Sequence, residues 1–256
     1  AARPQQFGDA ATPPTSGRDL MLAADLSGSM TEADMELGGT VVDRLTAAKA
    51  VLADFLDRRE GDRVGLLVFG QRAYAMTPLT RDLKTVREQL RDAVAGLAGR
   101  ETAIGDAIAL AVRRLRMQQD GQRVLILLTD GVNSAGVLTP QRAAELAREE
   151  RVRIHTIAFG SDGGFSLFGI PLPMPASAAE AIDEATLRDV AKQTGGRFYR
   201  ARDTDELVGI YAELDRLEPV EQPGKAVRPR NERYAWPLAA ALAVSLLAFL
   251  LPRRRA

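Results

Sequence analysis

Strand-like and helix-like segments alternate along most of this chain, and the alternation restricts the fold more than any other feature. Short apolar runs bounded by turn residues have the length of buried strands; they lie at 20–25, 64–69, 124–128 and 153–159, with shorter strand-like runs at 73–76 and 197–201. Segments with helical spacing of apolar residues lie at 40–59, 81–97, 104–119, 139–150, 183–194 and 204–217. This order predicts an α/β fold: a doubly wound, mostly parallel central sheet with helices on both faces.

Composition divides the chain of 256 residues into successive parts. The first residues are rich in Pro, Gly, Ser and Thr, which is typical of a loop. The expected parts are a lead-in loop at 1–17, the α/β domain at 18–217, a tether at 218–233, a transmembrane helix at 234–252 and a basic tail at 253–256.

The expectation of a transmembrane helix rests on the run from Trp236 to Leu251, which contains no charged residue. As a helix it would be ~24 Å long, somewhat short of the ~30 Å hydrocarbon core of a membrane. Tyr234 and Trp236 stand at one end of the run and arginines follow the other end, as expected at the two membrane interfaces. A core or amphipathic helix fits less well, because no face of the segment is polar.

One long segment, 160–182, interrupts the alternation and is predicted to be a loop that holds several large apolar residues. Loops of this length are uncommon in compact domains and are often functional. Two interpretations stay open: the loop packs back over the edge of the sheet, or it forms a surface for a partner.

Bulk composition excludes several classes of function. The formal net charge is zero, from 34 basic and 34 acidic residues, which does not favour nucleic acid as a partner. Cysteine is absent and His155 is the only histidine, so thiolate sites, a zinc site and a serine hydrolase triad are not expected. No phosphate-binding P-loop motif is present. His155 lies in the middle of a predicted strand, where a core or sheet-face position is expected.

Oxygen-bearing side chains gather where predicted strands end. Asp25, Ser27 and Ser29 follow the first strand, Asp130 follows the most apolar one, and Thr102 precedes a predicted helix. Singly, each is explained by a turn or a helix cap. In a doubly wound sheet, however, the three loops can meet at one carboxyl edge. Two carboxylates and three hydroxyls suit a hard cation such as Mg²⁺ or Mn²⁺, and an acidic group from outside could complete its coordination.

The same residues carry a resemblance to a known family. Asp25, Ser27 and Ser29, then Thr102, then Asp130 in "TDG" resemble the metal-ion-dependent adhesion site of von Willebrand factor type A domains. The stretches "DLSGSM", "RLTAAK", "TAIGDAI" and "ILLTDGVNSAG" are similar to the bacterial aerotolerance-type (Bat) membrane proteins. One departure is Glu101, where a small residue would be usual; an additional acid there could crowd or tune the metal.

The resemblance implies a membrane-anchored, metal-dependent module that binds an acidic group of a protein partner in a bacterial envelope complex. It suggests other von Willebrand type A membrane proteins and a MoxR-type AAA+ ATPase as partners. Two alternatives remain: a scaffold with an idle metal site, and a Mg²⁺-dependent phosphoryl transferase. The phosphoryl transferase would need another carboxylate two residues after Asp25, where Ser27 stands. We therefore expect that the protein is not an enzyme.

The expected location is the bacterial inner membrane, with the domain on the periplasmic side. Charges that flank the apolar run do not decide this, because basic residues stand on both sides of it; these are Lys225, Arg228, Arg230 and Arg233 before it and Arg253, Arg254 and Arg255 after it. Counting these residues slightly favours the opposite orientation, but the three arginines after the run are contiguous and directly follow it. The expectation depends on this contiguity and on the resemblance, which implies upstream membrane helices that would export the domain.

Overall fold

The structure is a computed structural model, and contacts divide it into two units. It describes residues 5–7, 18–59, 61–118, 122–160, 164–167, 170–173, 183–217, 230–232 and 235–250. One unit is Ser16–Glu221, and the other combines Ala1–Thr15 with Gln222–Ala256. The first unit contains the α/β domain.

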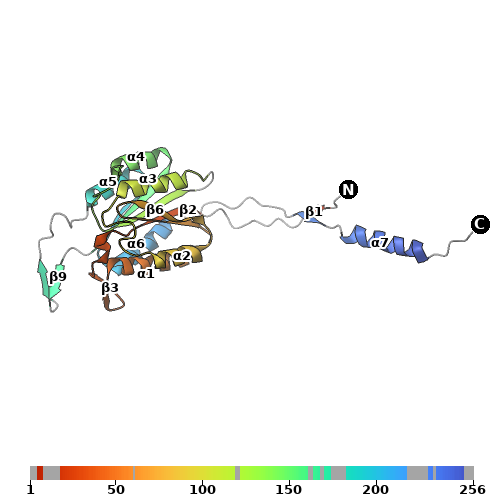
Figure 1. Ribbon diagram of the computed structural model, residues 1–256, viewed down its shortest axis with the longest axis horizontal. Coiled ribbons are helices and arrows are strands. Elements are labelled where there is room, and N and C mark those ends of the chain that lie inside the picture. Colours follow the sequence, from red (N-terminus) through yellow and green to blue (C-terminus); the bar gives the residue numbers. More distant parts are fainter. Residues whose placement is uncertain are drawn as a thin grey trace, which may run out of the picture. The chain divides into compact units, whose positions relative to one another are not determined.

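A six-stranded sheet forms the centre of this domain (Figure 1). Its strands are β2 (Asp19–Asp25), β5 (Arg63–Phe69), β6 (Ala73–Thr80), β7 (Arg123–Thr129), β8 (Val152–Phe159) and β11 (Phe198–Ala201). Their order across the sheet is β11-β8-β7-β2-β5-β6. Every neighbouring pair is parallel except β5 and β6. The prediction of a mostly parallel sheet is therefore confirmed, and β6 is a longer strand than the short run predicted at 73–76.

Helices cover both faces of the sheet, as the alternation predicts (Figure 1). One face carries α1 (Arg44–Asp57), α2 (Leu83–Asp92) and α6 (Thr204–Leu217), and the other carries α3 (Ile104–Leu115), α4 (Pro140–Glu149) and α5 (Glu184–Gln193). Side chains of α1, α2 and α6 share one buried apolar cluster with the sheet, and those of α3, α4 and α5 share the other. The two central strands, β2 and β7, are thus buried on both faces of the sheet, which explains their continuous apolar sequences.

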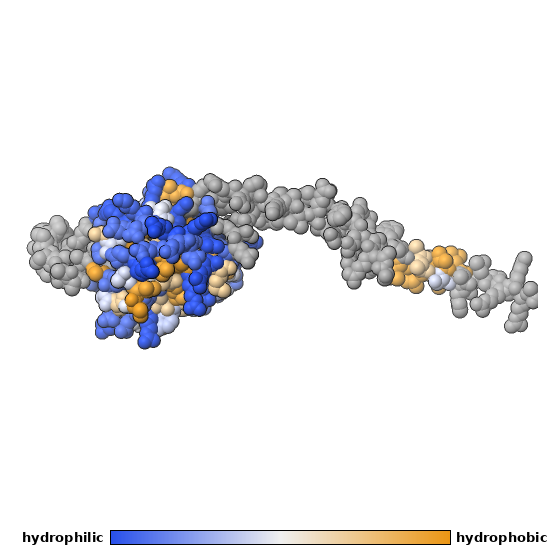
Figure 2. Space-filling model, turned by 90° about the horizontal axis from the view of Figure 1, so that it is seen from above, coloured by the Kyte–Doolittle hydropathy of each residue, from blue (hydrophilic) through white to orange (hydrophobic). Residues whose placement is uncertain are grey.

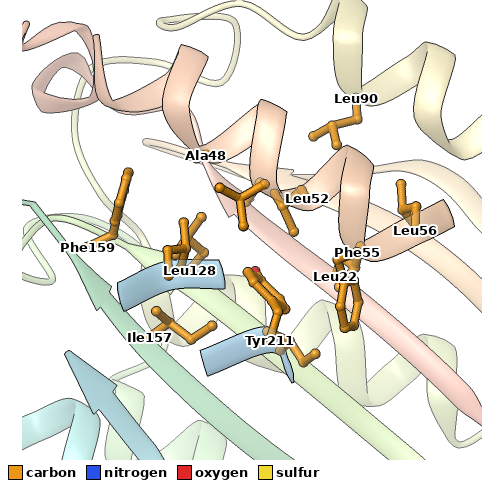
Figure 3. Close-up of a cluster of buried hydrophobic side chains, with 14 of the residues drawn as sticks. Leu22, Ala48, Leu52, Phe55, Leu56, Leu90, Leu128, Ile157, Phe159 and Tyr211 are labelled. Carbon is orange, nitrogen blue, oxygen red and sulfur yellow. The ribbon is translucent and has the colours of Figure 1, made fainter. Parts of the chain in front are cut away.

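Figure 3 shows the core on the α1 side of the sheet. Tyr211 of α6 lies between α1 and the strands, with its ring centroid 4.5 Å from that of Phe55. Leu22 of β2 and Leu128 of β7 face the same cluster. This packing fixes α1 against the sheet.

The helix predicted at 40–59 begins later than its spacing indicates. Residues Thr40–Val42 form a strand, β4, which pairs antiparallel with β3 (Met35–Leu37). Gly38 and Gly39 connect them with φ angles of 58° and 81°, a conformation that glycine adopts without strain. The Asp43 side chain then accepts a hydrogen bond from the Thr46 N–H and caps α1. The hairpin thus takes three residues that helical spacing alone had assigned to the helix.

Two other predicted helices are also too long. The structure ends α2 at Asp92 rather than at 97, and α3 at Leu115 rather than at 119. After α2 the chain turns through Gly96, whose N–H donates to the Leu26 carbonyl oxygen over 2.7 Å. Hydrogen bonds to another loop therefore replace the helix there. The remaining predicted helices and strands of the domain lie within two residues of their observed bounds.

The segment 160–182 is predicted to be a loop, but part of it forms strands. It contains β9 (Gly164–Leu167) and β10 (Ile170–Pro173), which pair antiparallel as a hairpin. Alternating residues of both strands bear the large apolar side chains that the sequence shows, a spacing that suits a strand. The two interpretations of this segment, packing over the sheet edge and binding a partner, concern residues outside those whose side chains the structure describes.

The second unit contains a strand pair and a helix. Strand β1 (Gln5–Phe7) pairs antiparallel with β12 (Arg230–Glu232); neither strand is predicted by the sequence, because three polar-rich residues carry no periodic signal. Helix α7 (Ala235–Leu250) lies where a helix is predicted. Within the described part of the chain, no helix combines the length and the apolar character needed to cross a membrane.

Candidate metal centre

The candidate site lies where β2 and β7, neighbours in the centre of the sheet, end side by side. Asp25 is the last residue of β2, and Asp130 directly follows the last residue of β7. From β2 the chain crosses to β5 on one side, whereas β7 leads to β8 on the other. The site is therefore at the point where the strand order reverses, which is the usual ligand position in open α/β sheets.

Asp25 is fully buried, and protein groups orient both of its carboxylate oxygens. The Ser27 N–H donates to Oδ1 over 2.8 Å, and the Thr129 hydroxyl donates to Oδ2 over 2.6 Å. Thr129 comes from the neighbouring strand, so the carboxylate joins β2 to β7. Nothing in the sequence distinguishes Thr129, which there is only the last residue of an apolar strand.

The two serines connect the β2 loop to Asp130. The loop continues from Asp25 into a short 3₁₀ turn, Gly28–Thr31. Ser27 Oγ lies 3.2 Å from Ser29 Oγ, and the Ser29 hydroxyl donates to Asp130 Oδ1 over 2.7 Å. Residues that are far apart in sequence thus place their oxygens in direct contact.

Contacts with the loop that follows β7 place Thr102 beside the residues next to Asp130. Its N–H donates to Ser134 Oγ over 3.0 Å, and its carbonyl oxygen accepts from the Ser134 N–H over 2.9 Å. Its Oγ1 lies 3.2 Å from the point where a Cβ on Gly131 would stand. The hydroxyl of Thr102 therefore lies against the residue next to Asp130.

Thr102 does not cap a helix, which was its simpler interpretation. Helix α3 begins at Ile104, and the Asn133 side chain accepts hydrogen bonds from the N–H groups of Ile104 and Gly105 at 2.8 and 3.3 Å. A residue of the β7 loop thus caps α3 from outside. This leaves the Thr102 hydroxyl available to the site.

Burial dominates the electrostatics of the two aspartates, and charge repulsion adds to it at Asp25. Burial, and then the nearby charge of Asp130, raise the pKa of the Asp25 carboxyl to about 7, against hydrogen bonds from Thr129 and Ser27 that lower it. Burial also raises the pKa of Asp130, while hydrogen bonds from Arg44 and Ser29 lower it. A divalent cation between the two carboxylates would relieve both the repulsion and the cost of burial.

Arg44, the first residue of α1, is a member of the site that sequence reasoning missed. Its Nη1 donates to Asp130 Oδ2 over 2.9 Å, across 86 positions of sequence. It also pairs with Asp34 and Glu32, with Nη2 at 2.6 and 2.8 Å from their carboxylate oxygens. Nothing in the local sequence distinguishes this arginine from other helix-start residues, and only the fold brings it to Asp130 at the carboxyl edge of the sheet.

The donor set fits a small hard cation. It offers only oxygen, from two carboxylates and the hydroxyls of Ser27, Ser29 and Thr102, which suits Mg²⁺ or Mn²⁺. Among the residues that the structure describes, no group of three or more His, Asp or Glu side chains could hold a metal ion. Hydroxyls and waters would therefore have to supply most of the coordination. Glu101 is exposed and does not add a buried carboxylate to this set.

Comparison with known proteins identifies the family. The family model described as von Willebrand factor type A domain matches residues 19–213, about the whole of the α/β unit. The chain belongs to the von Willebrand factor type A domain family. The order of strands and helices along this von Willebrand type A domain, and the resemblance found in its sequence, agree with this result.

Similar solved structures include two from Bacteroides. An aerotolerance-related membrane protein of Bacteroides fragilis is 26% identical with a TM-score of 0.62, and the match covers 77% of this chain and 98% of that one. The conserved hypothetical protein BatB of Bacteroides thetaiotaomicron is also 26% identical, with a TM-score of 0.64 and coverage of 78% and 98%. The resemblance to Bat proteins is thereby confirmed.

Other relatives extend the comparison. An uncharacterized protein of Borreliella burgdorferi is 26% identical over 92% of this chain and 69% of its own length. A proximal thread matrix protein of the mussel byssus shares the fold, with a TM-score of 0.60 and 21% identity over 81% of this chain and 47% of that one. That structure is described as having a zinc-occupied metal-ion-dependent adhesion site.

Proposed function

We propose that this von Willebrand type A domain binds a divalent metal ion, Mg²⁺ or Mn²⁺, and uses it to capture an acidic group of a protein partner at a bacterial membrane. Asp25, Ser27, Ser29, Thr102 and Asp130 would hold the ion. The carrying observation is the hydrogen bond of 2.7 Å between Ser29 and Asp130, which joins the oxygen atoms of the β2 and β7 loops at one point.

The charge balance of the donor set favours an acidic partner. Two carboxylates neutralise a divalent ion, and hydroxyls add coordination without adding charge. A carboxylate from a partner can then replace a water on the ion without excessive negative charge at the site. Other von Willebrand type A membrane proteins and a MoxR-type AAA+ ATPase are the partner classes that we propose to test first.

Metal-dependent capture tests this function. The full chain in mild detergent, immobilised, is exposed to solubilised membrane extract in Mg²⁺ or in chelator, and retained proteins are identified by mass spectrometry. We expect a partner that wild type retains only in Mg²⁺ and that Asp25→Ala does not retain. The same partner retained equally in chelator would contradict metal dependence and favour a scaffold with an idle site.

We also propose that the domain binds rather than catalyses. Ser27 stands where a phosphoryl transferase would use a second carboxylate as acid or base. His155, the single histidine, is buried in β8, and its Nδ1 accepts a hydrogen bond from the Arg197 N–H over 3.2 Å. This agrees with the sheet position expected for it, in which it serves packing and hydrogen bonding.

Arg100 provides a cation for an acidic partner beside the metal loop. Its carbonyl oxygen accepts the Gly28 N–H over 3.0 Å, its side chain is exposed, and its Nε lies 3.8 Å from where a Cβ of Gly28 would stand. We predict that Arg100→Glu lowers the affinity for the captured partner about tenfold, because opposed charges at a recognition surface become like charges. Binding measurements at low and high salt check this.

The matched control for Arg100→Glu is Arg114→Glu. Arg114 is an exposed arginine in the last turn of α3, the end of the helix opposite to the metal edge. We expect Arg114→Glu to leave the partner affinity unchanged. Equal losses for the two variants would mean that net charge, rather than the position of Arg100, governs capture.

We further propose that α7 attaches the protein to the bacterial inner membrane, with the domain on the periplasmic side. The large apolar side chains described in α7 are 57% to 66% exposed, and Figure 2 shows this part of the helix as a hydrophobic surface. The similar Bacteroides fragilis structure is described as a membrane protein. An exposed apolar helix in water is costly, and a membrane would cover it.

Deletion of residues 235–256 tests the membrane attachment. We predict that the truncated chain leaves the membrane fraction in carbonate extraction, whereas the full chain stays with it. Protease added to spheroplasts tests the side: a periplasmic domain is digested at once. Digestion only after lysis of the inner membrane would place the domain in the cytoplasm and contradict the proposed orientation.

A further inference from the structure

A buried cation, Arg44, occupies the metal edge of the sheet. Its side chain belongs to the first residue of α1 and is 8% exposed as a residue. Its Nη1 lies 2.9 Å from Asp130 Oδ2, and the Asp130 side chain is fully buried in this ion pair. A positive charge is therefore already in contact with a carboxylate that would bind the metal.

Two acidic residues hold the guanidinium of Arg44 in a fixed plane. Nε lies 3.0 and 3.1 Å from the two carboxylate oxygens of Asp34, and Nη2 lies 2.6 Å from Oδ2 of the same residue. Nη2 also pairs with Glu32 over 2.8 Å, and the Arg44 N–H donates to the Glu32 carbonyl oxygen over 3.0 Å. Such multiple bonds to a planar group set its orientation, so Nη1 is directed at Asp130.

Asp130 divides its two oxygens between different partners. Oδ2 accepts from Arg44, and Oδ1 accepts from the Ser29 hydroxyl over 2.7 Å. The nearby Asp25 is buried and accepts only uncharged donors, Ser27 and Thr129, among the contacts described. Among the contacts described, Arg44 is thus the cation that directly balances the buried carboxylate of Asp130.

We propose that Arg44 is a built-in counter-ion for Asp130, which keeps the metal-free site intact and competes with an incoming divalent ion for that carboxylate. The inference rests on the proposed metal-binding function. Arg44 acts through Asp130 and is a positioning residue. It explains how the carboxylate of Asp130 can be buried in the folded domain before a metal arrives.

Both parts of the proposal follow from the cost of buried charge. A buried carboxylate that loses its cation is strongly destabilising, because neither water nor an opposite charge stabilises it. When a divalent ion binds beside Asp130, however, its charge and that of Arg44 repel each other at short range. Removal of Arg44 should therefore weaken the metal-free fold and strengthen metal binding. Ser29 would still orient Asp130 through Oδ1.

A double-mutant cycle in chelator tests the counter-ion. Urea unfolding of the full chain in mild detergent is compared for wild type, Arg44→Gln, Asp130→Asn and the double variant. We expect Arg44→Gln to lower the unfolding midpoint clearly, and the double variant to be at least as stable as Arg44→Gln, because the unpaired charge is gone. Additive losses in the double variant would overturn the counter-ion role.

Calorimetric titration with Mg²⁺ alone tests the competition. We expect Arg44→Gln to bind Mg²⁺ about tenfold more tightly than wild type, and Arg44→Lys, which keeps the charge, to stay near wild type. The control Arg87→Gln removes an exposed arginine that pairs with Asp57 and should change nothing. Unchanged or weaker binding by Arg44→Gln would overturn the competition.

The two experiments separate this inference from the proposed function. If wild type binds Mg²⁺ and Arg44→Gln binds it no better, the metal site stands and the competition is wrong. If neither chain binds Mg²⁺, the proposed function fails and the competition fails with it. The cycle in chelator still decides the counter-ion role, because it needs no metal.

Discussion

Replacement of both Asp25 and Asp130 by alanine is expected to abolish the response of the protein to Mg²⁺. These residues are the only carboxylates in the donor set, and both are buried, at 0% and 2% exposed. At a Mg²⁺ concentration ten times its Kd, wild type should gain about 1.4 kcal/mol in the free energy of unfolding, and the double variant should gain nothing. Thermal unfolding with and without Mg²⁺, together with titration calorimetry, measures this.

The control for that experiment is an aspartate outside the site. Asp189 is exposed on α5, and Asp189→Ala should respond to Mg²⁺ as wild type does. Metal binding is expected to be weak, since Mg²⁺ gives up its waters reluctantly and the site adds few charges. Equal calorimetric binding by wild type and by the double variant would place the metal elsewhere on the chain.

Gly105→Ala is expected to destabilise the domain by about 3 kcal/mol, because its new Cβ would overlap with the backbone of a packed loop. Gly105 is the second residue of α3, and a Cβ there would lie 2.7 Å from the carbonyl carbon of Leu138 and 2.8 Å from that of Thr139. Backbone cannot rotate away as a flexible side chain can. The loop would shift, together with Asn133 and Ser134, which hold α3 and Thr102.

Replacing a glycine inside a helix by alanine usually stabilises a protein, whereas Gly105→Ala is expected to destabilise it. A second helical glycine is therefore the right control. Gly209 lies inside α6, and nothing stands within 4 Å of a Cβ built on it. Gly209→Ala should therefore stabilise by about 0.5–1 kcal/mol, through the lower backbone entropy of alanine in the unfolded chain. Urea unfolding of both variants checks the pair; stabilisation by Gly105→Ala would show that α3 is not packed as described.

A weaker Mg²⁺ response in Gly105→Ala would connect the packing to the site. The variant keeps all five predicted ligands and changes only the fit of α3 against the loop that follows β7. If Mg²⁺ binding falls along with stability, the position of Thr102 depends on that loop. If stability falls and Mg²⁺ binding does not, the loop contributes to the fold but not to the position of Thr102.

Local sequence determined the class of the fold and the chemistry of the site. Strand runs such as 124–128 are buried on both faces, so they read as continuous apolar segments, and parallel pairing follows from the helices between them. Asp25, Ser27, Ser29 and Asp130 are recognisable because polar oxygens directly follow apolar strands, where a packed core provides no reason for them. Thr102 by itself is a plausible helix cap, and it joins the set because its loop can meet the other two at one carboxyl edge of the sheet.

Tertiary structure decided the rest, because the relevant partners are remote in sequence. Helical spacing continues through 40–42, but Gly38 and Gly39 turn those residues into a hairpin with β3. Asn133 caps α3 from another loop, 29 positions away from Ile104. Arg44 reaches Asp130 across 86 positions, and only the docking of α1 on the sheet, through Phe55 and Tyr211, places it there. Periodicity reports which face of a helix is buried, but not which charged residue at its end meets a carboxylate of a distant strand.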